Sequence, residues 1–381
     1  MKRQRVLITI DWFLPGTKSG GPVRSYANMI DHLNHYYDFL IITRDTDYCS
    51  DEVYDSIQSD SWNQFNEHTS IYYFSKENLT RDNFSTLIKN TEFDILYVNG
   101  IYSWFFSILP ILLVDKRHKI IVSARGMLNA QAFSVKKFKK KLFLILANAI
   151  KLYKHVYFHA TNKDEAIQIE SHIKCFKGMY IAPNLPRKMQ GSTKAKQKHE
   201  GPTRFVNIAR VSIEKGTLKM IEAMRTITSE VILEIYGPIY DSEYWIKCQN
   251  SINELPKNLK VEYKGVLESE DVPNALNDYD YLILLSEGEN FGHAIIEALS
   301  SGLPVLISDN TPWKNLESKS IGWDVNIEKE EEIINAINKA TRMSPLEYSK
   351  WSKSALEFAD EFTQNPELIE QNKALFLSSQ N

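Results

Sequence analysis

"SEGENFGHAIIEALSSGLPVLISD", residues 286–309, is the stretch that decides the fold. The apolar run Tyr281–Leu285 before it is typical of a buried strand, and the seven residues after that run form a polar loop. Helical spacing of apolar residues then predicts a helix over His293–Ser301, with Gly302 as its left-handed stop and Pro304 opening the next strand. A strand, a helix and a further strand in this order predict a parallel sheet that is covered by helices.

The same alternation runs along most of the chain. Short β-rich runs such as "RVLITID" and "FDILYVNG" in the first half, and "RFVNIARV" and "VILEIYG" in the second, are separated by amphipathic segments. The predicted fold class is therefore α/β, with two doubly wound, Rossmann-like parallel-sheet domains facing each other across a cleft. The predicted divisions are an N-terminal domain (1–185), a linker (186–203), a second domain (204–350) and a C-terminal helical segment that packs back on the first domain (351–381).

The two glutamates of the opening stretch lie in positions that suit a sugar nucleotide. Glu289 precedes the predicted helix, where a carboxylate can accept hydrogen bonds from sugar hydroxyls. Glu297 lies one turn inside the helix, on the same face as His293, and can accept from a ribose diol. The backbone amides at the start of this helix form a predicted anion site made by Asn290, Phe291, Gly292 and His293. Alternatively, Glu289 is a dipole partner of the helix and Glu297 a solvated helix residue.

Two further loops follow predicted strands. Arg210 and Lys215 lie between the strand 204–209 and a helix that starts near Thr217, and two cations there suit a diphosphate. Gly20 and Gly21 follow the first strand and would let the backbone approach a ligand closely. Neither loop has the spacing of a Walker or G-x-G-x-x-G motif, which disfavours a nicotinamide dehydrogenase.

Composition narrows the class of protein. The chain has 381 residues, a net charge of −3 and three widely spaced cysteines, so nucleic-acid binding, a zinc site and a disulfide framework are disfavoured. A cytoplasmic protein is expected, because the N-terminal apolar run is too short for a signal peptide and no run reaches the roughly 18–20 residues of a membrane span.

Together these motifs resemble family 4 of the retaining glycosyltransferases, which have the GT-B fold and act in bacterial surface-polysaccharide synthesis. The resemblance rests on E-x7-E in "ENFGHAIIEALSSGLPV", R-x4-K at 210–215 and the early Gly-Gly. It implies that Glu297 holds the donor ribose, that Glu289 holds the transferred hexose, and that Arg210 and Lys215 neutralise the leaving diphosphate. The second domain would then bind a UDP-type or GDP-type sugar and the first a glycan or polyprenyl-linked glycan acceptor, with no cofactor and no metal.

The first half departs from the family pattern at two strand ends. Asn99 and Arg125 stand where histidines are frequent in the family, and His159 closes another strand. These three residues are candidates for acceptor or cleft contacts. For His159, a hydrogen-bonded structural role is the alternative.

Other functions remain open from the sequence. Asp45-Thr46-Asp47 after a strand would suit a metal-dependent GT-A transferase. A phosphorylase or nucleotide-sugar epimerase on the same scaffold, and a non-catalytic protein that binds nucleotide sugars or glycans, are further alternatives.

Residues 135–156 contain seven lysines interleaved with apolar residues. A basic, apolar segment too short to cross a bilayer predicts peripheral contact with the inner face of the plasma membrane. The alternative is a helix with one buried stripe and a solvated lysine end. The lysines that cluster at its start are Lys136, Lys137, Lys139, Lys140 and Lys141.

Overall fold

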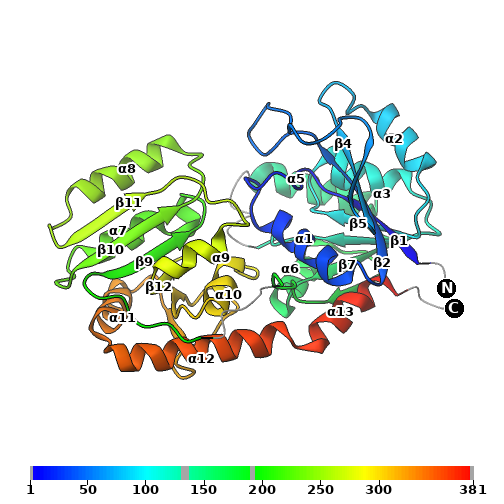
Figure 1. The fold of residues 1–381 in the computed structure, drawn as a ribbon. Helices are drawn as coiled ribbons and strands as arrows, with labels where there is room; N and C mark the ends of the chain where they lie inside the picture. Colours follow the sequence, from blue (N-terminus) through cyan, green and yellow to red (C-terminus); the bar gives the residue numbers. More distant parts are fainter. Residues whose placement is uncertain (1–2, 130–136, 189–193, 378–381) are drawn as a thin grey trace. The chain divides into compact units, whose positions relative to one another are not determined.

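The structure is a computed structural model that describes residues 3–129, 137–188 and 194–377. It forms two compact units (Figure 1). The first unit comprises Met1–Leu185 together with Asn365–Asn381, and the second comprises Pro186–Gln364.

An eight-stranded sheet forms the centre of the first unit, in the order β3-β4-β2-β1-β5-β6-β7-β8. All neighbouring strands are parallel except β3 and β4, which are antiparallel. The strands are β1 (Gln4–Thr9), β2 (Tyr37–Arg44), β3 (Trp62–Asn66), β4 (Thr69–Phe74), β5 (Ile95–Asn99), β6 (Lys119–Ser123), β7 (Val156–Ala160) and β8 (Gly178–Ile181). The helices between them are α1 (Gly21–Leu33), α2 (Arg81–Asn90), a π-helical turn (Trp104–Ile108), α3 (Leu109–Leu113), α5 (Lys137–Ala149) and α6 (Lys163–His172).

The second unit has a six-stranded, wholly parallel sheet in the order β11-β10-β9-β12-β13-β14. Its strands are β9 (Thr203–Ile208), β10 (Val231–Tyr236), β11 (Leu259–Tyr263), β12 (Tyr281–Leu284), β13 (Val305–Ser308) and β14 (Gly322–Val325). Its helices are a 3₁₀ turn (Ile213–Lys215), α7 (Thr217–Met224), α8 (Ser242–Asn253), α9 (Val272–Ala275), a second 3₁₀ turn (Leu276–Asp278), α10 (His293–Ser300), α11 (Glu330–Arg342) and α12 (Pro345–Thr363).

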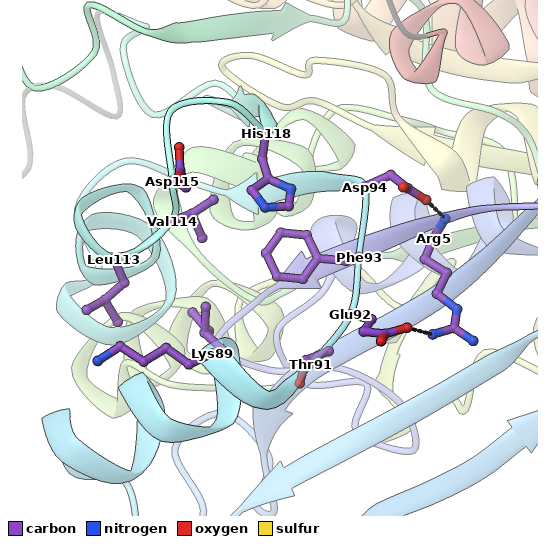
Figure 2. A pocket seen from close by; sticks show the side chains of 11 residues that line it. Arg5, Lys89, Thr91, Glu92, Phe93, Asp94, Leu113, Val114, Asp115 and His118 are labelled. Atoms are coloured by element: carbon purple, nitrogen blue, oxygen red, sulfur yellow. Dashed lines mark hydrogen bonds and ion pairs between the residues drawn. The ribbon is translucent and has the colours of Figure 1, made fainter.

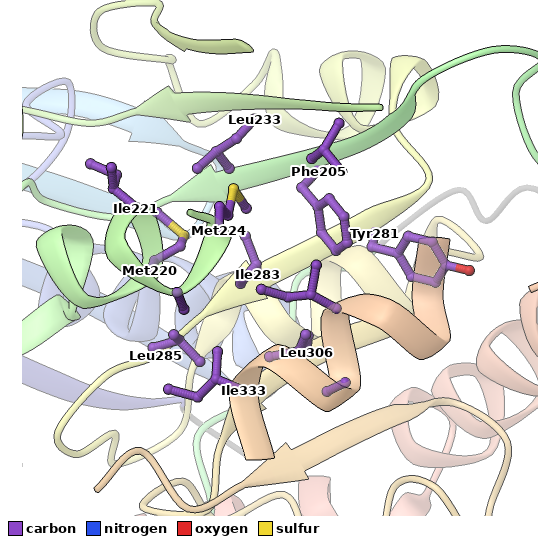
Figure 3. Packing of buried hydrophobic residues seen from close by; sticks show 14 of the residues in the cluster. Phe205, Met220, Ile221, Met224, Leu233, Tyr281, Ile283, Leu285, Leu306 and Ile333 are labelled. Carbon is purple, nitrogen blue, oxygen red and sulfur yellow. The ribbon is translucent and has the colours of Figure 1, made fainter. Parts of the chain in front are cut away.

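Strand β12 shows why an unbroken apolar run predicts a parallel sheet. Tyr281 and Ile283 point into the cluster that α7 and α11 cover, which also holds Phe205, Met220 and Ile333 (Figure 3). Leu282 and Leu284 point into the cluster on the other face, with residues of α10 and α12. Because successive side chains alternate between two buried faces, every position of the strand must be apolar.

The predicted elements of the opening stretch are confirmed. Strand β12, helix α10 and strand β13 follow one another, and Gly302 has the left-handed φ of 73° expected of a helix stop. The predicted start of a helix near Thr217 is confirmed by α7.

The end of the chain divides between the units. Helix α12 packs against α10 and brings Phe358 and Phe362 onto Trp313, so the second unit extends beyond the predicted limit of residue 350. Helix α13 (Pro366–Phe376) belongs to the first unit, where Phe376 packs its ring against Tyr37, Phe39 and Tyr97. In the described part of the segment 351–381, α13 thus belongs to the first unit and α12 to the second.

The latter part of the predicted linker is bound to the second unit. Lys196 Nζ donates to the Leu276 carbonyl oxygen at 2.7 Å, and Lys198 Nζ donates to three carbonyl oxygens at the end of α11. Lys198 thus satisfies acceptors that a helix C-terminus leaves without an intrahelical donor. Composition predicted an irregular segment here but could not predict these anchors.

Candidate functional site

Two loops of the second unit meet where the adjacent strands β9 and β12 end. The Glu287 amide donates to the Glu214 carbonyl oxygen at 2.9 Å, which joins the loop after β12 to the loop after β9. Gly216 allows this approach: its φ is +67°, and a Cβ there would lie 2.2 Å from the Leu285 carbonyl oxygen. The close contact therefore requires glycine on both steric and conformational grounds.

The junction brings two predicted site residues into direct contact. Lys215 Nζ lies 2.5 Å from Glu289 Oε1, and the side chains are only 20% and 14% exposed. The Ser286 hydroxyl donates to the same Glu289 oxygen at 2.7 Å. Glu289 is therefore an ion-pair partner of Lys215, a more specific role than that of a dipole partner of the helix. Sequence spacing did not single out Ser286, although its position directly after a buried strand is a usual place for functional residues.

Arg210, in the loop after β9, is the second cation predicted for this junction. Its side chain is exposed, and it forms no hydrogen bond or ion pair with the residues at 3–129, 137–188 and 194–377. Glu214, which no sequence motif singles out, has a lowered pKa: burial opposes the shift, but hydrogen bonds and the charges of Arg210 and Lys215 outweigh it. The loop after β9 thus holds one exposed cation and one cation already paired with Glu289.

The start of α10 lies beside this pair. Gly292 is its N-cap with φ 79°, and no side chain caps the helix, whose start lies in the predicted amide site at 290–293. The loop after β13 supports it: Trp313 Nε1 donates to the Phe291 carbonyl oxygen at 2.5 Å, and the Glu289 amide donates to the Asn310 carbonyl oxygen at 3.3 Å. Loops from three neighbouring strand ends therefore form one edge of the sheet, which is where ligands bind in such folds.

Glu297 is only 3% exposed, between Ile296 and Ala298, which are also buried. It is therefore not a solvated helix residue, and the alternative of a freely hydrated side chain is wrong. His293, four residues earlier, is 7% exposed and packs its ring edge-on against Phe291, with centroids 4.8 Å apart.

In the first unit, the predicted Gly20–Gly21 loop precedes α1. Gly20 is the N-cap of α1 with φ 77°, and a Cβ at either glycine would meet nothing within 4 Å. Asp47 holds the loop in place, because its carboxylate accepts hydrogen bonds from the amides of Thr17 and Lys18 at 3.0 and 3.1 Å. The backbone at Gly20 and Gly21 is therefore open to close approach.

Asp45 and Asp47, the pair that would suit a metal-dependent GT-A transferase, both serve the local structure. Asp45 accepts a hydrogen bond from Ser59 Oγ at 2.8 Å, and Asp47 anchors the glycine loop. Within the described parts of the chain, no cluster of three or more His, Cys, Asp or Glu side chains could hold a metal ion.

Asn99, Arg125 and His159 lie at the carboxyl ends of the neighbouring strands β5, β6 and β7. Tyr97 connects two of them: its hydroxyl lies 3.3 Å from an Arg125 Nη and 2.5 Å from His159 Nδ1. Arg125 also donates to Asn184 and lies over the Tyr26 ring at 4.5 Å. Asn99 is 6% exposed, and its carbonyl oxygen accepts from Ser107.

His159 has the structural role. It is 1% exposed, and Nε2 lies 2.8 Å from the Ala182 carbonyl oxygen, which can only accept, so Nε2 carries the proton and Nδ1 accepts from Tyr97. Burial, aided by the Arg125 charge, lowers the pKa of His159 to about 3. Because the ring is neutral and both of its nitrogens are hydrogen-bonded, it stabilises the packing at the ends of these strands.

Glu165 fixes the loop that carries Arg125. Arg125 and Gly126 have left-handed φ values of 51° and 72°, and the Gly126 amide donates to Glu165 Oε1 at 2.6 Å. The other oxygen of Glu165 accepts from the amide and hydroxyl of Thr161. The pattern Asn162-x-x-Glu165 at the start of α6 marks a helix cap in the sequence, but not this tertiary contact.

Helix α5 is apolar on two sides. Leu144 and Ala147 are buried, and Phe143 packs edge-on against Tyr102 with centroids 5.3 Å apart. The opposite side is exposed and carries Phe138 (80%), Leu142 (48%), Ile145 (56%) and Leu146 (55%), followed after the helix by Ile150 (68%). Lys139 and Lys141 are exposed on the same helix; Lys136 and the rest of 130–136 lie outside the described residues, as does the side chain of Lys137. No helix of the described chain is long and apolar enough to span a bilayer.

A pocket of about 530 Å³ lies elsewhere in the first unit, where β5 and β6 begin (Figure 2). Within it, the Arg5 amide donates to Asp94 at 2.8 Å and the Arg5 guanidinium to Glu92 at 3.4 Å. It contains none of the predicted site residues. The residues that line it are Arg5, Ile88, Lys89, Thr91, Glu92, Phe93, Asp94, Leu113, Val114, Asp115 and His118.

Part of the chain is similar to a known protein family. Residues 190–358 match the model of the family Glycosyl transferases group 1, so the match covers the segments that hold Arg210, Lys215, Glu289 and Glu297. A curated relative, the uncharacterized glycosyltransferase MJ1059 of Methanocaldococcus jannaschii, is 27% identical over 221 residues. That alignment spans 53% of this chain and 52% of the relative, about half of each.

Solved structures match the architecture along nearly the whole chain. Sucrose-phosphate synthase from Thermosynechococcus elongatus has a TM-score of 0.69 at 15% identity, with 98% of each chain covered. WaaG, a glycosyltransferase involved in lipopolysaccharide biosynthesis, has a TM-score of 0.68 at 14% identity, covering 99% of this chain and 100% of WaaG. HepE of Anabaena, solved in complex with UDP and glucose, has a TM-score of 0.67 at 14% identity and 98% coverage of each chain.

The predicted GT-B fold is thereby confirmed, which excludes the GT-A architecture. Residues 190–358 are thus similar to group 1 glycosyltransferases, and the chain has the GT-B fold.

Proposed function

We propose that the chain is a retaining glycosyltransferase that moves a hexose from a nucleoside diphosphate sugar to a hydroxyl group of a glycan acceptor, without a metal. The observation that carries the proposal is the contact between Lys215 and Glu289, next to the exposed Arg210. Two motifs that lie 74 residues apart meet at one sheet edge, beside the uncapped start of α10. This arrangement offers cations and amides for a diphosphate and a carboxylate for the attached sugar.

The proposed chemistry needs charge stabilisation more than it needs a protein nucleophile. As the bond between the sugar and the diphosphate breaks, negative charge grows on the leaving phosphate oxygen. Arg210 and Lys215 oppose that charge with fixed positive groups, while the α10 amides donate hydrogen bonds. The acceptor oxygen bonds to the anomeric carbon on the face from which the diphosphate leaves, which gives retention, and the departing phosphate oxygen takes the acceptor's proton. Glu289 positions the sugar, and Glu297 holds the ribose.

The donor is a UDP-type or GDP-type sugar, and the two bases remain equal candidates. UDP and UDP-glucose are bound in the structures of HepE, and UDP-2-fluoro glucose in an E. coli structure, and these structures have this fold at low identity. A test is a panel of UDP-sugars and GDP-sugars, with turnover measured on polyprenyl-linked and free glycans and the product anomer identified by NMR. Turnover with retention supports the proposal. Binding of nucleotide sugars without turnover favours a non-catalytic binder, and conversion of the donor alone favours an epimerase.

The proposal that the reaction needs no metal has a separate test. We expect Arg210→Ala and Lys215→Ala each to depress turnover, since each removes a charge that opposes the leaving diphosphate. We expect wild-type activity to survive exhaustive EDTA treatment, and manganese not to rescue either variant. Activity that EDTA abolishes and manganese restores would contradict this part of the proposal.

We further propose that the acceptor is carried on a lipid at an anionic membrane surface of the cytoplasm, in surface-polysaccharide synthesis, and that the segment 135–156 contacts that surface. The support is the exposed apolar side of α5, on which Phe138, Leu142 and Ile145 lie on one helix face, with Lys139 and Lys141 beside them. Apolar side chains would enter the headgroup region while lysines meet anionic lipid, each lysine contributing on the order of 1 kcal/mol.

Liposome co-sedimentation tests this contact. We expect binding to anionic but not neutral vesicles, weakened by high salt, by Lys139→Gln with Lys141→Gln, and by Phe138→Ser with Leu142→Ser. Leu346→Ser with Ile246→Ser is a matched control, because these apolar side chains are also exposed (71% and 54%) but lie on α12 and α8. Wild-type protein that stays in the supernatant with anionic vesicles at low salt would favour an acceptor in solution.

A further inference from the structure

Glu289 uses one carboxylate oxygen for two donors. Oε1 accepts from the Ser286 hydroxyl at 2.7 Å and pairs with Lys215 Nζ at 2.5 Å. No hydrogen bond reaches Oε2 from residues in the described ranges. Since two donors on different elements hold one oxygen, the plane of the carboxylate is fixed, and Oε2 is left to accept from a ligand.

The position of Ser286 suits its hydrogen bond to Glu289. It is completely buried two residues after the end of β12, and its hydroxyl donates a hydrogen bond to Glu289, three residues later. A buried hydroxyl bound to a carboxylate is a strong, charge-assisted contact with a short reach. Lys215, by contrast, is a flexible point charge that can follow a carboxylate through a range of orientations.

We propose that Ser286 is a positioning residue that sets the orientation of Glu289, so that Oε2 meets a hydroxyl of the donor sugar. The inference rests on the proposed function, in which the second unit binds a nucleotide sugar. Without the Ser286 hydroxyl, the carboxylate turns to pair both oxygens with the Lys215 ammonium. The sugar then loses its acceptor, whereas the nucleoside diphosphate keeps Arg210, Lys215 and the α10 amides.

The test compares two ligands by titration calorimetry on the full chain: UDP or GDP alone, and the corresponding UDP-glucose or GDP-mannose. For Ser286→Ala we expect affinity for the diphosphate to stay within about twofold and affinity for the nucleotide sugar to fall about tenfold, the range of a lost hydrogen bond to a charged group. Ser286→Thr, which keeps the hydroxyl, should restore the difference. Ser352→Ala is the matched control, because Ser352 is also fully buried but accepts from the Lys196 amide in the same unit.

A double-mutant cycle separates this role from a purely structural one. If Ser286 acts through Glu289, Ser286→Ala should have no further effect on nucleotide-sugar affinity in the Glu289→Gln background. Equal losses for both ligands, no loss for the nucleotide sugar, or additive losses in the cycle would each overturn the inference while leaving the proposed function standing. A wild-type protein that binds neither ligand would overturn the proposed function, and this inference with it.

Discussion

Glu297 is a buried carboxylate in helix α10. Single substitutions at this position test its proposed role in binding the donor. We expect Glu297→Ala to lower nucleotide-sugar affinity by about 1.5–3 kcal/mol, because a donor hydroxyl loses a charged acceptor. Calorimetric titration measures the loss. Glu297→Gln controls for the volume of the buried side chain, and circular dichroism of both variants checks the fold. Unchanged affinity in a folded Glu297→Ala variant would remove this residue from the site.

The buried ring of His159 makes the free energy of unfolding depend on pH. Its pKa of about 3 in the folded chain lies below its ordinary value of 6.5, so the unfolded chain binds more protons between these pH values. Stability therefore falls as the pH drops from 6.5 toward 3. We expect His159→Gln to lower the slope of unfolding free energy against pH by up to about 1.4 kcal/mol per pH unit near pH 5.

Chemical denaturation at several pH values between 4 and 6.5 measures this slope. The groups that face His159 are Tyr97, Arg125 and the Ala182 carbonyl, and none of them changes charge in that range. His155→Gln is a suitable control, since His155 is exposed at the start of the same strand. Equal slopes for wild type and His159→Gln would show that the buried ring is protonated in the folded chain.

At the scale of elements, the site depends on how closely the loop after β9 approaches the end of β12. Gly216→Ala should break this approach, because the new Cβ would lie 2.2 Å from the Leu285 carbonyl oxygen. We expect a lower thermal midpoint and loss of donor binding, since Lys215 precedes the displaced residue. Thermal unfolding and nucleotide titration measure the two effects.

Comparison with Gly201→Ala separates the effect of the steric clash from the effect of backbone strain. Gly201 also has a positive φ (+87°) but has open space around the position of a Cβ. Both substitutions therefore carry the cost of a left-handed alanine, about 1–2 kcal/mol, and only Gly216→Ala adds the clash. Equal effects of the two substitutions on stability and binding would refute the role given to the close contact.

At the scale of the whole molecule, the two units have separate sheets and separate cores, and the proposed donor groups of the β9, β12 and β13 loops all belong to the second unit. We expect UDP or GDP to slow amide hydrogen exchange in 210–216 and 286–293, where the carboxyl ends of β9 and β12 meet. The turns 226–230 and 254–258, at the amino ends of strands in the same sheet, are internal controls. Protection confined to those turns would place the nucleotide at the wrong edge for the proposed site.

Local pattern in the sequence was enough for the strand–loop–helix–strand order around Glu289 and for the class of fold. Those features depend on contacts between near neighbours: apolar runs need two covered faces, and Gly302 ends α10 through its own backbone freedom. The motif spacing also selected Arg210, Lys215, Glu289 and Glu297. It could not show that Lys215 and Glu289 touch, because their distance depends on β9 and β12 being neighbours in the sheet.

Tertiary structure alone decided the rest. Helix α5 has apolar residues on two sides, so its sequence could not show which side packs on Tyr102 and which side stays exposed. Glu297 is buried and His159 is neutral because of neighbours brought from other elements. The C-terminal helices are divided between the units because Phe358 and Phe376 find aromatic partners in different cores. In each case the sequence determines which side chains are available, whereas burial, pairing and pKa depend on which distant side chains the fold places beside them.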